Sequence, residues 1–313
     1  MFDFIMNPLY YAISFILKGW HTGLTAPAIG LDGDGGLSWA LSIIGLTLII
    51  RAALIPLFVK QIKSSRNMQL IQPKVKALQK KYGHDKEKLA QETMKLYKES
   101  GTNPFASCLP ILLQMPIFFA LFGVLRSAAK EQPKGVLSSE DARQFGEAQL
   151  GSVPLSGTLL GANGELATVA LAAALVLLMT ATTFLTQRQL MSKNMPADAL
   201  SGPYAQQQKL LLYVLPLVFA VGGVAFPIGV LLYWSTSNAW TMGQQFYVIR
   251  NNPAPGTPAA AAKQQRDDAK AARHGVVPEA TETTIVEEPA VDPKPAPRQQ
   301  PKRQTRQQRK KKK

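Results

Sequence analysis

Charged side chains are almost absent from four long stretches of this 313-residue chain. Residues 105 to 125, 166 to 187 and 210 to 249 contain none, and residues 37 to 59 contain only Arg51. A bilayer core of about 30 Å requires about 20 apolar residues for each helical crossing. The missing charge therefore argues against a soluble globular protein and predicts an all-α polytopic membrane protein.

Residues that carry catalytic or metal chemistry are also scarce. The chain has one cysteine, Cys108, and three separated histidines, which excludes an intrachain disulfide framework and every CxxC or HExxH motif. It contains no Walker loop, no GxGxxG and no G-x-S-x-G. The segment Asp32-Gly-Asp34-Gly-Gly36 resembles the start of a calcium loop, but Ile43 stands where the bidentate Glu is required. We therefore expect no enzyme activity, no metal and no cofactor.

Five transmembrane helices account for the uncharged runs. The 40 uncharged residues from Leu210 to Ile249 would form a helix of about 60 Å, twice the bilayer, so they must fold back on themselves. Gly222, Gly223 and Pro227 mark that turn. The predicted spans are 37 to 59, 105 to 126, 166 to 187, 209 to 223 and 227 to 249, with internal prolines read as kinks.

The distribution of Lys and Arg predicts the orientation of these spans. Segment 60 to 104 has 11 basic residues, 188 to 209 has three and 250 to 313 has 15, whereas loop 126 to 165 has four together with five acids. This alternation places the basic segments in the cytoplasm. We expect a multi-pass protein of a bacterial cell membrane with an N-out and C-in topology.

Residues 1 to 36 are predicted to form an extracytoplasmic amphipathic helix followed by a loop. The opening MFDFIMNPLYYAISFILKGW has Asp3 and no basic residue before Lys18, unlike the basic start of a secretory signal. It favours a helix that lies in the outer interface. Two alternatives stay open, namely a cleaved segment, since Ala26-Pro-Ala28 resembles a cleavage site, and a sixth span.

Residues 61 to 100 predict a cytoplasmic hairpin of two amphipathic helices. Apolar residues recur at helical spacing on both sides of the breaker Tyr82-Gly83-His84-Asp85. A merely solvated loop would explain the positive charge but not this periodicity. We expect the hairpin to contact anionic lipid or a partner through basic residues such as Lys63, Arg66, Lys74, Lys76, Lys80 and Lys81.

Residues 251 to 313 are predicted to be a disordered basic tail. Pro, Ala, Gln and Lys dominate there and aromatic residues are absent, so the segment cannot bury a core. The tail ends in a block of like charge that suits a polyanion, either anionic lipid or ribosomal RNA. Its last five residues are Arg309, Lys310, Lys311, Lys312 and Lys313.

Arg51 is the strongest functional candidate. It lies 14 residues after Leu37 and nine before Lys60, which corresponds to about 21 Å and 13 Å along a helix. A buried arginine costs at least about 2.5–3.5 kcal/mol on insertion scales, so it must face water or a partner. An arginine that only locks helices together is the structural alternative. The other spans offer no carboxylate to neutralise it.

Polar residues in several spans predict a hydrophilic, positively charged groove around Arg51 that opens to the cytoplasm. Some of them recur at helical spacing, although Thr and Ser also serve as ordinary interhelical contacts. The candidates are Thr47, Gln114, Thr180, Thr183, Gln187, Trp234, Asn238, Thr241 and Gln245.

Three segments resemble signatures of the YidC/Oxa/Alb family of membrane protein insertases. They are LIIRAALIPLFVKQIKSSRNMQLIQPKVKALQKKYG (48 to 83), NPFASCLPILLQMPIFFALFGVLR (103 to 126) and FPIGVLLYWSTSNAWTMGQQ (226 to 245). The resemblance covers roughly residues 37 to 250, and the chain resembles a short bacterial, actinobacterial form. It implies a core of five transmembrane helices, at 37 to 250, around a groove open to cytoplasm and lipid.

The resemblance also implies roles for individual residues. Arg51 and Thr47 correspond to groove residues, Gln187 to the third-span glutamine, and Tyr233 and Trp234 to the aromatic pair of the last span. It implies nascent membrane proteins and the Sec translocon as partners, with the hairpin in substrate capture and the basic tail assisting ribosome binding. We expect a monomer when active.

Two other functions are compatible with the residues alone. A small-solute transporter or channel predicts a continuous pore, although the lack of intramembrane Asp or Glu weakens proton coupling. A ribosome or lipid tether predicts that the tail carries all activity and that the spans are passive anchors.

Overall fold

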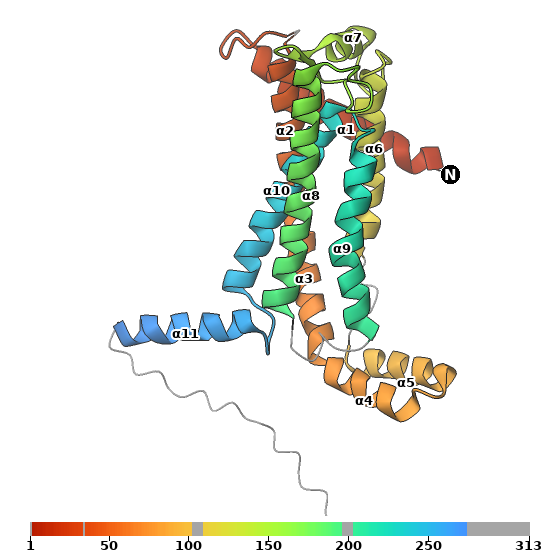
Figure 1. The fold of residues 1–313 in the computed structure, drawn as a ribbon, viewed down its shortest axis with the longest axis vertical. Helices are drawn as coiled ribbons and strands as arrows, with labels where there is room; N and C mark the ends of the chain where they lie inside the picture. The colour runs from red at the N-terminus through yellow and green to blue at the C-terminus, as the bar shows by residue number, and fades with distance from the viewer. Residues whose placement is uncertain (1, 34, 102–108, 196–202, 274–313) are drawn as a thin grey trace, which may run out of the picture. The chain divides into compact units, whose positions relative to one another are not determined.

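The computed structural model describes residues 2–33, 35–101, 109–195 and 203–273, and nearly all of their regular structure is helical. The chain divides into two compact units, residues 1–266 and residues 267–313. Of the second unit only the last residues of helix α11 are described. The sections below concern the first unit (Figure 1).

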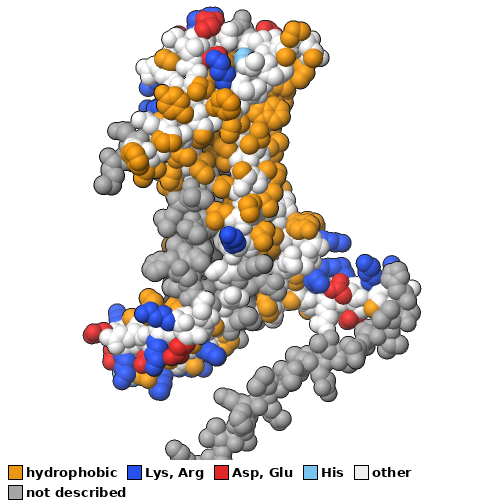
Figure 2. Space-filling view, turned by 180° about the vertical axis from the view of Figure 1, so that it is seen from behind, with side chains coloured by type: hydrophobic (Ala, Val, Ile, Leu, Met, Phe, Trp, Pro, Cys, Tyr) orange, Lys and Arg blue, Asp and Glu red, His pale blue; other side chains and the backbone are white. Residues whose placement is uncertain are grey.

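Among the described residues, a helix lies at the position of each of the five predicted spans. These helices are α2 (Gly36–Ala53), α6 (Leu109–Ala128), α8 (Leu166–Asn194), α9 (Pro203–Gly223) and α10 (Ile228–Asn251). Helix α10 packs against α8 and α2, and α9 packs against α8. Within the described residues, α2 and α8 are long and apolar enough to cross a membrane, and α6 and α9 carry shorter apolar stretches, Gln114–Ala128 and Leu212–Gly223. Figure 2 shows hydrophobic side chains over much of one face of these helices.

The first predicted span, 37 to 59, is not one helix. Helix α2 ends at Ala53 and α3 (Ile55–Leu70) begins after Leu54. Proline lacks an N–H and clashes with the carbonyl four residues earlier, but both defects are harmless in the first turn of a helix. The break therefore places Pro56 at the start of α3. It is one residue long, and hydrogen bonds of 3.1 Å from the Leu54 N–H to the Ile50 carbonyl and from the Phe58 N–H to the Leu54 carbonyl continue across it, so the interruption lies where the proline kink was predicted.

A helical hairpin follows α3. Helix α4 (Gln72–Tyr82) starts with Pro73 in its first turn, and α5 (Lys86–Glu99) packs against α4. Asp85 caps α5, because its carboxylate accepts a hydrogen bond of 3.0 Å from the Lys88 N–H. The turn lies at the predicted breaker, whereas residues 61 to 70, assigned to the hairpin from the sequence, belong to α3.

Helix α1 (Phe2–Thr25) crosses both α6 and α2. Tyr10 lies over Gly123 of α6, and a Cβ at Gly123 would come within 2.9 Å of the tyrosine ring. Trp20 lies over Gly45 of α2, where a Cβ would come within 2.5 Å of the indole. Glycine at both crossings allows α1 to approach the bundle closely.

The ends of α2, α6 and α8 next to loop 126–165 are called the loop end here. Helix α7 (Ser139–Glu147) and a two-residue hairpin, β1 (Gln149–Leu150) with β2 (Val153–Pro154), cover it. The Ser138 hydroxyl caps α7 by accepting a hydrogen bond from the Asp141 N–H. The Asp141 carboxylate forms a 2.6 Å ion pair with the Lys18 ammonium of α1. Burial alone would raise the pKa of Asp141, but the hydrogen bonds from Lys18 and Ser138 outweigh it and lower this pKa. The loop is therefore folded onto α1 rather than being a plain surface connection.

Part of the predicted disordered tail is helical. Helix α11 (Pro258–Arg273) begins after Thr257, whose hydroxyl accepts a 3.3 Å hydrogen bond from the Ala260 N–H. Its sequence, PAAAAKQQRDDAKAAR, is rich in alanine, the residue with the highest helix propensity. A segment without a hydrophobic core can thus still form a helix, so the prediction of disorder was wrong for residues 258–273.

Candidate functional site

Arg51 lies in the last turn of α2 and reaches α10. Its Nε donates a 3.0 Å hydrogen bond to the Ser237 hydroxyl, and a second guanidinium nitrogen, Nη2, donates to the same oxygen. Ser237 is buried, whereas Arg51 is half-buried. Among the described residues no carboxylate pairs with Arg51. The guanidinium therefore donates to one neutral hydroxyl, and it has further N–H donors that Ser237 does not accept.

Tyr233 lies one helical turn before Ser237 on α10. Its side chain is 4% exposed, and its hydroxyl accepts a 3.2 Å hydrogen bond from the Gln114 amide of α6. Thr47, one turn before Arg51, is buried and donates a 2.7 Å bond to the Ile43 carbonyl of its own helix. Arg51, Ser237, Tyr233 and Gln114 thus form a polar cluster between α2, α10 and α6, called the arginine cluster below.

A second polar contact joins α10 to α8. The Asn238 amide donates to the Thr183 hydroxyl at 2.9 Å and to the Met179 carbonyl at 3.2 Å. Ser237 and Asn238 are adjacent, so their side chains point about 100° apart on α10. The structure therefore divides the predicted polar residues between two faces of α10, where the sequence interpretation placed them around one cavity.

Trp234 belongs to neither polar group. Its indole packs against three rings, with centroid distances of 5.0 Å to Phe118, 4.8 Å to Phe219 and 5.8 Å to Phe226. Phe118 belongs to α6 and Phe219 to α9, so this aromatic cluster connects α6, α9 and α10. Gln187, on α8, is half-buried.

The basic candidates of the hairpin are mostly exposed to solvent. Lys74, Lys80 and Lys81 are exposed, and Lys76 is half-buried. The side chains of Lys63 and Arg66 lie outside the described residues, as do the tail residues Arg309, Lys310, Lys311, Lys312 and Lys313.

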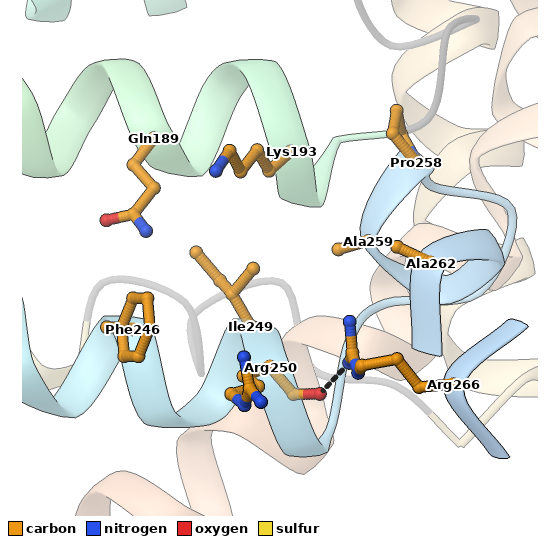
Figure 3. Close-up of a pocket in the computed structure, with 9 residues that line it drawn as sticks. All are labelled: Gln189, Lys193, Phe246, Ile249, Arg250, Pro258, Ala259, Ala262 and Arg266. Carbon is orange, nitrogen blue, oxygen red and sulfur yellow. Dashed lines mark hydrogen bonds between the residues drawn. The ribbon is translucent and has the colours of Figure 1, made fainter. Parts of the chain in front are cut away.

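A separate basic pocket lies where α8, α10 and α11 meet. It has a volume of about 280 Å³ and contains the side chains of Lys193, Arg250 and Arg266. The Arg266 guanidinium donates a 2.7 Å hydrogen bond to the Arg250 carbonyl, which connects the middle of α11 to the end of α10 (Figure 3). Arg51 does not line this pocket. Within the described part of the chain, no group of three or more His, Cys, Asp or Glu could hold a metal ion.

Ser237 is the functional candidate that the sequence interpretation missed. It lies in the polar run Ser235-Thr236-Ser237-Asn238, whose four side chains point in four directions around the helix and all carry a hydroxyl or an amide. Periodicity alone cannot select one of these residues. Its spacing of four from Tyr233 was the available signal, since residues four apart share a helix face.

Comparison with known proteins adds independent evidence. Residues 31–255 match the family described as 60Kd inner membrane protein. A "Membrane protein insertase YidC" of Streptomyces avermitilis is 45% identical over 284 residues, covering 88% of this chain and 64% of the relative. One of Tropheryma whipplei (strain Twist) is 38% identical over 284 residues, covering 85% of this chain and 91% of the relative.

A solved structure is also similar to the chain. It is described as "Active YidC insertase crystal structure with the first transmembrane domain resolved" and has 25% sequence identity and a TM-score of 0.47, covering 76% of this chain and 45% of that one. The matches in sequence extend over most of the chain and include actinobacterial relatives. The chain therefore belongs to the 60Kd inner membrane protein family, the family of the YidC membrane protein insertases.

Proposed function

We propose that this protein inserts nascent membrane proteins into a bacterial cell membrane through a positively charged groove around Arg51. The observation that carries the proposal is the guanidinium of Arg51, held between α2 and α10 by a serine hydroxyl and paired with no described carboxylate. A full charge at this depth is costly unless water or substrate completes its hydrogen bonds. Family membership makes a substrate chain the natural occupant.

The proposed topology places the loop end outside and the hairpin inside. Helices α4 and α5 carry many Lys residues, whereas the basic and acidic residues of loop 126–165 nearly balance. Lys and Arg are enriched in cytoplasmic segments. Helix α1, which crosses α2 and α6, would then lie in the outer interface.

The mechanism needs no bond chemistry and no nucleotide. Water in the groove would shorten the low-dielectric path, so that fewer polar groups of the substrate lose their hydration at once. Arg51 would attract an acidic substrate segment while the following apolar helix moves sideways into lipid. Tyr233 and Trp234 would form the apolar side of that path, and because Trp234 contacts Phe219, α9 would have to yield as the helix leaves.

The partners follow from the same arrangement. The hairpin would contact substrate, the Sec translocon or anionic lipid through the exposed Lys74, Lys80 and Lys81. The tail beyond α11 would add contacts with the ribosome or anionic lipid through its terminal basic block. We propose a monomer as the active form.

The decisive experiment compares Arg51→Ala with Arg51→Lys in proteoliposomes. Two single-spanning substrates with the same apolar helix are used, one with an acidic and one with a neutral translocated segment. Arg51→Ala should slow insertion of the acidic substrate by at least about fivefold, which corresponds to about 1 kcal/mol, while Arg51→Lys keeps most of the rate because it keeps the charge.

The pattern of results separates electrostatic attraction from general damage. Equal slowing of both substrates would indicate a structural role for Arg51, and unchanged insertion of the acidic one would contradict the electrostatic mechanism. Deletion of residues 251 to 313 should leave part of the activity, whereas a ribosome or lipid tether would lose all of it. Solute flux through the reconstituted protein would favour a channel instead.

A further inference from the structure

A second basic pocket lies at the loop end of α6. It has a volume of about 320 Å³ and lies between α1 and the last turns of α6. Met6, Tyr10, Phe119 and Phe122 supply apolar and aromatic walls. Its basic lining residues are Arg126, Lys130 and Lys134.

These three cations lack acidic partners among the described residues, although carboxylates are close in sequence. Glu140 and Glu147 both pair with Arg143, and Asp141 pairs with Lys18. The Glu131 side chain lies beside Gly146, within 3.4 Å of where a Cβ would stand. Three carboxylates of the loop are thus paired with cations outside the pocket, and no described carboxylate forms an ion pair with the cations that line it.

Two of the cations, Arg126 and Lys134, lie over aromatic rings instead of pairing with carboxylates. The Lys134 ammonium lies 4.1 Å from the centroid of the Tyr10 ring, and the Arg126 guanidinium lies 5.7 Å from that of Phe122. A ring face positions a cation but neutralises no net charge. An anion that enters the pocket would therefore meet three positive groups, of which aromatic rings position Arg126 and Lys134.

An exposed apolar surface of α6 continues from the apolar part of the pocket. Met115, Phe119, Phe122 and Arg126 are spaced by three or four residues, so they form one stripe of the helix. Met115 and Phe119 are each 44% exposed despite being large and apolar. The stripe is thus apolar and exposed at one end and cationic at the other. A phospholipid has the matching arrangement, with an apolar acyl chain at one end and an anionic phosphate at the other.

We propose that this pocket binds an anionic phospholipid, with the phosphate at Arg126, Lys130 and Lys134 and an acyl chain along Phe119 and Met115. A soluble phosphate compound would satisfy the cations but leave the exposed apolar stripe unused. The site is independent of Arg51, and under the proposed topology it lies in the outer leaflet. It would fix α1 to α6, since Tyr10 and the α6 residues line the same pocket.

Photo-crosslinking in vesicles tests the proposal on the full chain. The photoreactive residue benzoylphenylalanine replaces Phe119, and the vesicles contain equal amounts of phosphatidylglycerol and phosphatidylcholine with identical acyl chains. The control position is Leu177, which is 68% exposed on α8 and has no role in the pocket. We expect phosphatidylglycerol to be enriched by at least about fivefold over phosphatidylcholine at position 119, because a single nearby basic residue already contributes about 1 kcal/mol, and not at position 177.

Charge variants connect that enrichment to the three cations. The combined variant Arg126→Gln, Lys130→Gln and Lys134→Gln should abolish it, and the single variant Lys130→Gln, at an exposed side chain, should lower it by up to about fivefold. The matched control Lys86→Gln, Lys88→Gln and Lys98→Gln removes the same charge from exposed hairpin positions and should leave it unchanged. Unaltered crosslinking at position 177 verifies that each variant is folded.

Three outcomes would overturn the proposal. Equal crosslinking of both lipids at position 119 would mean that no anion is recognised. Persistence of the enrichment in the folded single and triple variants would mean that the three cations do not bind the anionic lipid. Complete displacement by soluble glycerol 3-phosphate would identify a site for a free phosphate compound rather than a lipid.

Discussion

Substitution Ser237→Ala separates a hydrated Arg51 from a dry one. The Ser237 hydroxyl accepts hydrogen bonds from Nε and Nη2 of Arg51, and no described carboxylate replaces it. A hydrogen bond to a charged group contributes about 1.5–3 kcal/mol when its loss leaves the charge unsatisfied. If water reaches the guanidinium, water takes the position of the hydroxyl and the cost falls below about 1 kcal/mol.

The assay is the free energy of unfolding in lipid bicelles, measured beside a control from the same helix. Ser235 is buried on α10 and its hydroxyl has no hydrogen-bond partner among the described residues. Ser235→Ala therefore removes the same atom without breaking a hydrogen bond and should leave the free energy of unfolding unchanged or raise it. The difference between the two variants isolates the arginine contact.

A hydrated groove around Arg51 requires that Ser237→Ala lower the free energy of unfolding only slightly. We expect Ser237→Ala to destabilise the protein by less than about 1 kcal/mol and to keep insertion of acidic-tailed substrates, because Arg51 stays charged and hydrated. A loss of about 2 kcal/mol or more, with Ser235→Ala neutral or stabilising, would show a dry guanidinium. That result would refute the hydrated groove while leaving family membership intact.

Three further predictions concern the rest of the bundle. Asn238→Ala should cost about 1–2 kcal/mol of unfolding free energy, because it removes both contacts to α8, whereas Arg51-dependent insertion should persist. Trp234→Ala should cost about 3–5 kcal/mol by emptying the aromatic cluster, and Trp234→Phe much less, in the same unfolding assay. The pKa of Asp141 is lowered in the folded state, so its carboxylate stabilises the protein above its unfolded pKa of about 3.9. This stabilisation is lost as the pH falls through the folded pKa. Asp141→Asn should therefore reduce the loss of unfolding free energy over that acidic pH range.

Composition predicted the bundle because long uncharged runs have few alternatives in a membrane. Exclusion of charge over 166 to 187 and 210 to 249 requires helices, and the length of the second run requires a turn. Exact ends were harder to predict, since a helix can continue beyond the hydrocarbon. Helix α8 runs past Gln187 to Asn194 and so carries Arg188 and Lys193 at its polar end.

Prolines decided the helix breaks in a way that hydropathy could not show. Pro56 lies in an apolar run and Pro73 in a basic one, yet each falls in the first turn of a new helix. The missing N–H of proline is harmless only in that turn. A local backbone rule therefore divided segments that the membrane argument treated as continuous.

The contacts of Arg51 could not be predicted because they depend on how α10 rotates against its neighbours. Tyr233, Trp234, Ser237 and Asn238 are close in sequence, but the first and third face the arginine cluster, the second enters an aromatic cluster and the fourth contacts α8. Sequence spacing gives the angles between these side chains and not which neighbouring helix lies at each angle. Only the packing of α10 against α8 and α2 determines that choice.

A serine partner gives Arg51 a property that a carboxylate would remove. Guanidinium has five N–H donors, and Ser237 accepts from two of its nitrogens without neutralising the charge. An Asp or Glu at this position would form an ion pair whose field largely cancels at the distance of a substrate, and a buried pair is hard to separate. Under the proposed mechanism, Ser237 orients the guanidinium, and among the described residues no carboxylate cancels its positive field, so that it could attract an acidic segment without binding it permanently.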